Sequence, residues 1–132
     1  TILHALETDR VGFLKDFHKN FYNYVEAQEN YVSKAQLHYD WNIASNASPR
    51  ATIQAAKSWA ETDFRSELVN INVPCLIVHG DDDKIVPILT SAEQAARGIA
   101  NNVYHIINGG PHGLNVTHKN HLNKILIDFL SV

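Results

Sequence analysis

The 132-residue sequence lacks several features that mark secreted, membrane and nucleic-acid-binding proteins. It has a single cysteine, Cys75, so no disulfide framework exists and nothing indicates an oxidising compartment. It has no long apolar run, which excludes a transmembrane helix. Its 11 basic side chains against 14 acidic ones form no basic block for nucleic acid. We therefore expect one cytoplasmic globular domain without nucleic-acid or membrane partners.

The amino terminus lacks the features of a secretion signal. Residues 1–10 have no cationic stretch followed by an apolar one, which a signal peptide requires. The sequence also contains no methionine, and its first residues already have the pattern of an approach to a helix. We therefore expect Thr1 to be an internal position of a longer protein.

Residues 1–64 show helical periodicity and no strand pattern. Phe13, Phe17 and Phe21 recur every four residues, with Leu14 and Tyr24 beside them, which predicts an aromatic stripe on one helix face. Packing into a core is the ordinary role of such a stripe.

Two further helices have clear amino-terminal signals. Ser33 is a candidate N-cap for a helix that carries Trp41 and weakens at Asn46. Ser48 is a candidate N-cap for the next helix, because Pro49 suits the first helical position, where its missing N–H costs nothing.

The pattern changes after residue 73. Residues 75–78 and 103–107 are short apolar runs typical of buried strands, and residues 91–99 between them have a helical pattern. This order predicts a β-α-β crossover with parallel strands, so the expected fold class is α/β. Parallel sheets normally have more strands, which another chain or another part of this one would supply. An amphipathic helix closes the chain, with its apolar face formed by Leu122, Ile125, Leu126, Phe129 and Leu130.

Chemically active side chains follow both predicted strands, in residues 79–87 and 108–113. The carboxyl ends of parallel strands share one edge of a sheet, so a carboxylate of the first loop and His112 of the second would lie side by side. Such a pair is typical of the acid and the histidine in a nucleophile–histidine–acid triad. Spacing alone leaves open which of Asp81, Asp82 and Asp83 is the acid.

Residues 75–87 (CLIVHGDDDKIVP), 110–114 (GPHGL) and 117–118 resemble the C-terminal part of an α/β-hydrolase. Residues 41–50 and 61–65 narrow the resemblance to the cap of cofactor-free, non-haem haloperoxidases and related arylesterases. The resemblance implies a helical cap segment at residues 1–64 and the C-terminal part of the hydrolase core at residues 65–132.

The resemblance also implies the site. It identifies Asp83, four residues before Pro87, as the triad acid and His112 as the triad histidine. The family's nucleophile is a serine in a G-x-S-x-G pattern, which none of the seven serines here matches. Trp41 and the phenylalanine stripe are implied as candidate lining of an acyl pocket under the cap.

For the complete enzyme the resemblance implies serine-hydrolase-type acyl transfer without a haem, metal or other cofactor. The implied partners are a small ester or carboxylic acid, hydrogen peroxide, a halide and the N-terminal half that carries the serine. Self-association into a homo-oligomer stays open.

Other interpretations remain. The three aspartates could form a magnesium site or a solvated turn, and His118 with His121 could bind zinc, although a solvated helix face suits that pair better. We expect Cys75 to act as a small apolar residue, and His79 to be packed or hydrogen-bonded near the loop rather than a second base. In the alternative function, the chain is a non-catalytic interaction module whose open strand edge docks onto a partner, or it is an orphan fragment.

Overall fold

The computed structural model describes residues 1–26 and 32–131. The chain divides into two compact units. The helical unit comprises residues 1–20 and 24–63, and the α/β unit comprises residues 21–23 and the chain from Phe64 onward. No helix in the described ranges is long and apolar enough to cross a membrane.

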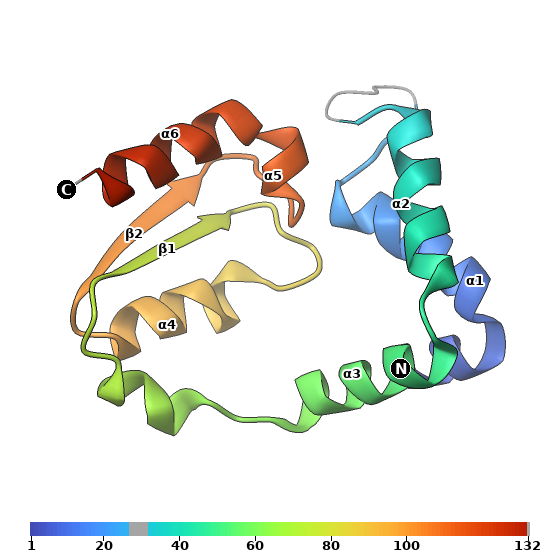
Figure 1. The fold of residues 1–132 in the computed structure, drawn as a ribbon, viewed down its shortest axis with the longest axis horizontal. Coiled ribbons are helices and arrows are strands. Elements are labelled where there is room, and N and C mark those ends of the chain that lie inside the picture. Colours follow the sequence, from blue (N-terminus) through green and yellow to red (C-terminus); the bar gives the residue numbers. More distant parts are fainter. Residues whose placement is uncertain (27–31, 132) are drawn as a thin grey trace. The chain divides into compact units, whose positions relative to one another are not determined.

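The helical unit is built from α1 (Ile2–Phe21), α2 (Lys34–Asn46) and α3 (Pro49–Glu61), shown in Figure 1. Both predicted N-caps are confirmed. The Ser33 hydroxyl accepts a hydrogen bond from the backbone N–H of Gln36 at 3.1 Å, and the Ser48 hydroxyl accepts one from Ala51 at 3.4 Å. These bonds satisfy amide groups that the first turn of a helix leaves without partners.

Helix α1 contains a break that the sequence pattern did not predict. Asp9 has extended backbone angles (φ −146°, ψ 79°), and its carboxylate accepts a hydrogen bond from the N–H of Gly12 at 2.9 Å. Asp9 therefore acts as the N-cap of the second part of α1.

The aromatic stripe is shorter than predicted. The Phe13 and Phe17 rings lie 5.9 Å apart, but α1 ends at Phe21, so Tyr24 lies beyond the helix. Asn23 has φ 50°, and this left-handed conformation interrupts the helical path before Tyr24.

Side-chain hydrogen bonds from Arg10 and Trp41 join α1 and α2. The Arg10 guanidinium donates to the carbonyls of Ala44 (3.3 Å) and Ser45 (2.6 Å) in the last turn of α2. The Trp41 indole N–H donates to the Val11 carbonyl at 3.0 Å. Arg10 thus places a positive charge and two donors at carbonyls in the last turn of α2, where a cation is favourable to the helix.

The α/β unit confirms the predicted crossover. Strands β1 (Cys75–Gly80) and β2 (Asn102–Ile107) are parallel, with Cys75 opposite Asn102 and Gly80 opposite Ile107. The α-helix α4 (Ala92–Gly98) connects them, and short 3-10 helices lie at Arg65–Asn70 and Ile88–Thr90. The chain ends with α5 (Leu114–Thr117) and α6 (Lys119–Leu130). Figure 1 shows the two strands between α4 and α6.

The core of the α/β unit is small. It consists of Ile107, Leu114 and Ile125, with partly buried Leu76, Val78 and Leu122 packed against them. The closing helix is confirmed, but two residues predicted on its apolar face are exposed, Leu126 at 39% and Leu130 at 76%. Only the two strands lie beneath α6 in the described residues, so its last turn has no sheet to pack on.

Candidate active site

The structure brings two of the sequence-predicted site residues together. Asp83 follows the carboxyl end of β1, and His112 follows that of β2. The Asp83 Oδ2 atom lies 2.7 Å from His112 Nδ1, a hydrogen-bonding distance. Their meeting follows from the parallel register, which ends both strands at the same edge of the sheet.

Backbone hydrogen bonds hold the two loops against each other. The Asp81 N–H donates to the Ile107 carbonyl at 3.2 Å, and the Asp82 N–H donates to the Gly110 carbonyl at 3.1 Å. A third bond runs from the Gly109 N–H to the Asp81 carboxylate at 2.6 Å. The loops are so close that a Cβ atom on Gly80 would lie 2.0 Å from the Gly110 oxygen. Only glycine fits at position 80 without displacing the histidine loop.

Asp83 is held as a carboxylate. Its side chain is only 3% exposed, and its Oδ1 atom accepts 2.8 Å hydrogen bonds from the N–H groups of Ile85 and Val86. Burial acts to raise the pKa of Asp83, but hydrogen bonds from Val86, His112 and Ile85 outweigh it and lower the pKa below its ordinary value. The group therefore carries its negative charge next to His112 at neutral pH.

His112 is oriented by the bond to Asp83. An ionised carboxylate can only accept, so Nδ1 of the neutral ring carries the hydrogen and Nε2 keeps the lone pair that can take up a proton. The side chain is about one-third exposed (32%), so the ring remains accessible. This arrangement suits a general base.

Phe21 contacts the histidine loop and Asn23 contacts the aspartate loop, which sequence reasoning did not predict. The Phe21 ring meets the His112 ring edge to face, with centroids 4.7 Å apart, and the Phe21 carbonyl accepts a 2.9 Å hydrogen bond from the Gly113 N–H. The Asn23 amide donates to the Asp82 carbonyl and carboxylate, both at 2.7 Å. Helical periodicity detected Phe21 but carries no information about partners so distant in sequence.

The three aspartates have separate partners, which disfavours the magnesium alternative. Asp81 accepts from Gly109, Asp82 from Asn23, and Asp83 from its own loop and His112. Within residues 1–26 and 32–131, no three histidine, cysteine, aspartate or glutamate side chains are grouped as metal ligands. His118 and His121 belong to no such group of ligands in the described residues, so the zinc alternative has no support from the structure.

His79 is hydrogen-bonded near the loop, as predicted. Its Nε2 atom lies 2.9 Å from the Val86 carbonyl oxygen and 3.1 Å from Asp83 Oδ2. Cys75 is half-buried, and its thiol donates to the Val73 carbonyl at 3.3 Å.

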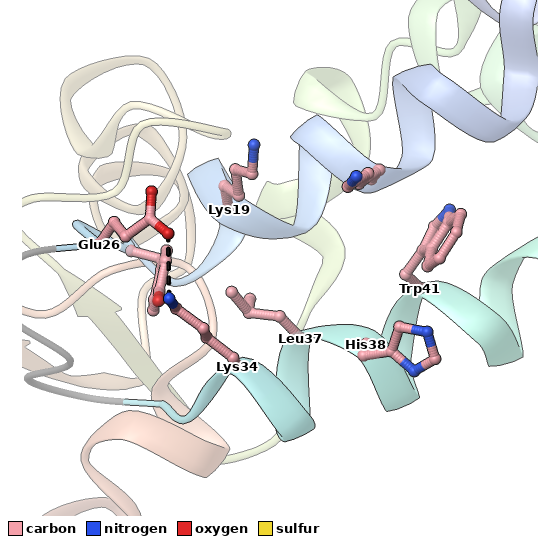
Figure 2. Close-up of a pocket in the computed structure, with 8 residues that line it drawn as sticks. Lys19, Glu26, Lys34, Leu37, His38 and Trp41 are labelled. Carbon is pink, nitrogen blue, oxygen red and sulfur yellow. Dashed lines mark hydrogen bonds and ion pairs between the residues drawn. The ribbon is translucent and has the colours of Figure 1, made fainter.

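Trp41 lines a pocket of about 340 Å³ in the helical unit. Its indole ring lies beneath the Lys15 ammonium at 5.7 Å, and a 3.0 Å ion pair joins Lys34 and Glu26 at the same pocket (Figure 2). The remaining lining residues are Lys19, Tyr24, Leu37 and His38. All of these belong to the helical unit, and a substrate-lining role for Trp41 stays a prediction.

Comparison with known proteins defines the class. Residues 6–118 match the family model of the alpha/beta hydrolase fold. The chain therefore belongs to the α/β-hydrolase fold family, and the fold class predicted from the sequence is confirmed. In this fold the nucleophile precedes the acid and the histidine, so the chain corresponds to the C-terminal portion of the fold.

Individual relatives narrow the likeness to non-haem haloperoxidases. The chain is 38% identical over 129 residues to a candidate non-heme chloroperoxidase of Synechocystis sp., covering 98% of the chain and 46% of the relative. It is 32% identical over 90 residues to a bifunctional esterase/perhydrolase of Acinetobacter calcoaceticus, covering 68% of the chain and 33% of that protein.

A solved structure gives the same likeness. A bromoperoxidase from Bacillus anthracis matches with a TM-score of 0.94 and 38% identity, covering all of this chain and 48% of that one. The predicted resemblance to non-haem haloperoxidases is confirmed. Nearly all of this chain is matched by these curated relatives, and the chain spans about half of their length.

Proposed function

We propose that the complete protein is a serine hydrolase that transfers acyl groups, acting as an esterase and perhydrolase with cofactor-free haloperoxidase activity. The observation that carries this proposal is the 2.7 Å hydrogen bond between Asp83 and His112 at the carboxyl edge of the parallel strands. The relatives named chloroperoxidase and esterase/perhydrolase support it.

His112 is the general base in this mechanism. Its Nε2 takes the proton of the serine hydroxyl, which the nucleophile-bearing half of the enzyme supplies, while the serine oxygen bonds to the acyl carbon. His112 then gives the proton to the departing alcohol or water, leaving an acyl-enzyme. Asp83 stabilises the imidazolium ion and keeps the ring in its reactive tautomer.

Release of the acyl group requires a second acceptor. His112 deprotonates water or hydrogen peroxide, whose oxygen attacks the acyl carbon, and the serine leaves with the proton from the imidazolium ion. Water gives a carboxylic acid and hydrogen peroxide gives a peracid. The peracid transfers an oxygen atom and its proton to bromide or chloride in solution, which yields hypohalous acid and the carboxylate, and the carboxylate regains a proton from water to return to the carboxylic acid.

The compartment and the substrate are parts of the proposal. The single cysteine supports the cytoplasm, and the substrate class is a small ester or carboxylic acid. Lining of the acyl pocket by Trp41 belongs to the same proposal, supported by its place in a pocket of the helical unit.

The chain also has features of an interaction module. In its described part the sheet has two strands, and Val103 and Ile106 on β2 are about half exposed. A module of this kind would bind a partner along the sheet without needing the Asp83–His112 pair.

The first experiment is to read the coding sequence upstream of Thr1 in the same frame. We expect an apolar strand followed by G-x-S-x-G. The protein expressed from that frame, called the full-length enzyme below, should hydrolyse p-nitrophenyl acetate, and should brominate monochlorodimedone when given acetate, hydrogen peroxide and bromide.

Two histidine variants of the full-length enzyme separate the functions. His112→Ala should lower the esterase kcat by about 10³-fold or more, because the base is lost. His121→Ala, on an exposed position of α6, should leave kcat unchanged. Equal losses in both variants, or a stop codon immediately before Thr1, would favour the interaction module.

A further inference from the structure

His79, near the end of β1, contacts the same carboxylate oxygen as His112. Its Nε2 atom lies 3.1 Å from Asp83 Oδ2, and His112 Nδ1 lies 2.7 Å from that oxygen. The His79 side chain is only 14% exposed. Two imidazole rings therefore share one oxygen of the proposed triad acid.

The neighbours of His79 determine which ring nitrogen carries the hydrogen. The Val86 carbonyl oxygen, 2.9 Å from Nε2, can only accept a hydrogen bond. Asp83 Oδ2 already accepts from His112, so it is an acceptor as well. The Nε2 atom must therefore carry a hydrogen, which it donates to the carbonyl, and this N–H group lies 3.1 Å from the carboxylate oxygen.

The two oxygens of Asp83 are held differently. Backbone N–H groups of Ile85 and Val86 hold Oδ1, each at 2.8 Å. Among the described residues, the hydrogen bonds and ion pairs of Oδ2 come from the side chains of His112 and His79 alone. If His79 were absent, only His112 would hold Oδ2 in place when the carboxylate rotates about the Cβ–Cγ bond. His112 is the group that Asp83 has to orient, so it cannot also serve as the fixed support.

We propose that His79, as its Nε2–H tautomer, is a positioning residue that fixes Oδ2 of Asp83 in the place where His112 needs it. The inference rests on the proposed acyl-transfer function, in which His112 is the base. His79 acts through Asp83 and makes no contact with the reacting atoms.

A purely structural role would give a different result. Val86 donates its N–H to Asp83 and accepts from His79 through its carbonyl, so His79 also closes the loop from β1 to residue 86. Glutamine at position 79 keeps an amide N–H donor at a similar reach, whereas leucine keeps the bulk and removes the donor. A positioning role predicts rescue by glutamine, and packing alone predicts that leucine suffices.

The test compares His79→Leu, His79→Gln and the control His121→Leu in the full-length enzyme, with p-nitrophenyl acetate as substrate. We expect His79→Leu to lower kcat about 10- to 100-fold with little change in KM, because small displacements of catalytic groups cost rate on this order. His79→Gln should restore most of kcat, and His121→Leu should match the unmodified enzyme. A kcat for His79→Leu within about twofold of the unmodified enzyme, or equal losses in both His79 variants, would overturn the proposal.

A second readout needs no activity. In ¹⁵N-histidine-labelled full-length protein, NMR at neutral pH should show a hydrogen on Nε2 of His79, assigned by the loss of that signal in His79→Gln. A neutral Nδ1–H tautomer would overturn the proposal. If the unmodified enzyme hydrolyses no ester, the proposed function fails, and the tautomer still decides whether His79 donates to Asp83 and Val86.

Discussion

The Phe21 ring lies against the His112 ring edge to face, with centroids 4.7 Å apart. The Phe21 carbonyl also accepts the Gly113 N–H at 2.9 Å, so both the ring and the backbone of this residue contact the histidine loop. Two groups thus restrict the imidazole: Asp83 at Nδ1 and Phe21 at the ring. Aromatic pairs of this geometry are stabilised beyond the area that they bury.

Phe21→Leu in the full-length enzyme should lower kcat for p-nitrophenyl acetate by about 10-fold, because the His112 ring gains rotational freedom while its bond to Asp83 remains. Phe129→Leu is the matched control, since Phe129 lies in the last turn of α6 in the same unit. An equal loss in both variants would mean that Phe21 acts only through stability.

Asp83→Asn should lower kcat by about 10⁴-fold, as loss of the charged acid does in other triads, because an amide neither stabilises the imidazolium ion nor fixes the tautomer. The control is Asp82→Asn, which keeps an acceptor oxygen for Asn23 and lies outside the pair. Steady-state kinetics on both variants measures the difference, and a loss in Asp82→Asn as large as that in Asp83→Asn would contradict the specific role of Asp83.

The lowered pKa of Asp83 also predicts a pH dependence of stability. The folded-state pKa lies below the ordinary value of 3.8, so the unfolded chain binds the proton more readily. The ionised carboxylate stabilises the folded state fully when the pH is above the pKa of Asp83 in the unfolded chain. This stabilisation is lost as the pH falls through the pKa of Asp83 in the folded state. The Tm of the full-length enzyme should exceed that of Asp83→Asn most at neutral pH, and the gap should close in the acid range below 3.8. A gap independent of pH would contradict this linkage.

Asp9→Ala should destabilise the helical unit by about 1 kcal/mol, the usual cost of removing an N-cap. The Gly12 N–H would lose the acceptor that caps the second part of α1. Asp16→Ala is the control, because its ion pair with Lys19 is exposed and contributes little. Chemical denaturation of the full-length enzyme gives both free energies of unfolding.

Local signals in the sequence were sufficient for much of this fold. Ser33 and Ser48 were identifiable as caps because capping depends on residues three positions away. The meeting of Asp83 and His112 was predictable because parallel strands end at one edge. The break at Asp9 and the contact of Phe21 with His112 were not, since both depend on tertiary geometry that periodicity does not encode. The shared oxygen at His79 likewise requires the folded loop.

Besides the bond between Asp83 and His112, three hydrogen bonds join the two loops without either of these side chains. They run from Asp81 to Ile107, from Asp82 to Gly110 and from Gly109 to Asp81. Replacing Asp83 and His112 therefore removes the bond between their side chains and leaves these three bonds available. This edge of the sheet can exchange one pair of functional groups for another without rebuilding its scaffold, which makes it a starting point for designing a different chemistry at the same place.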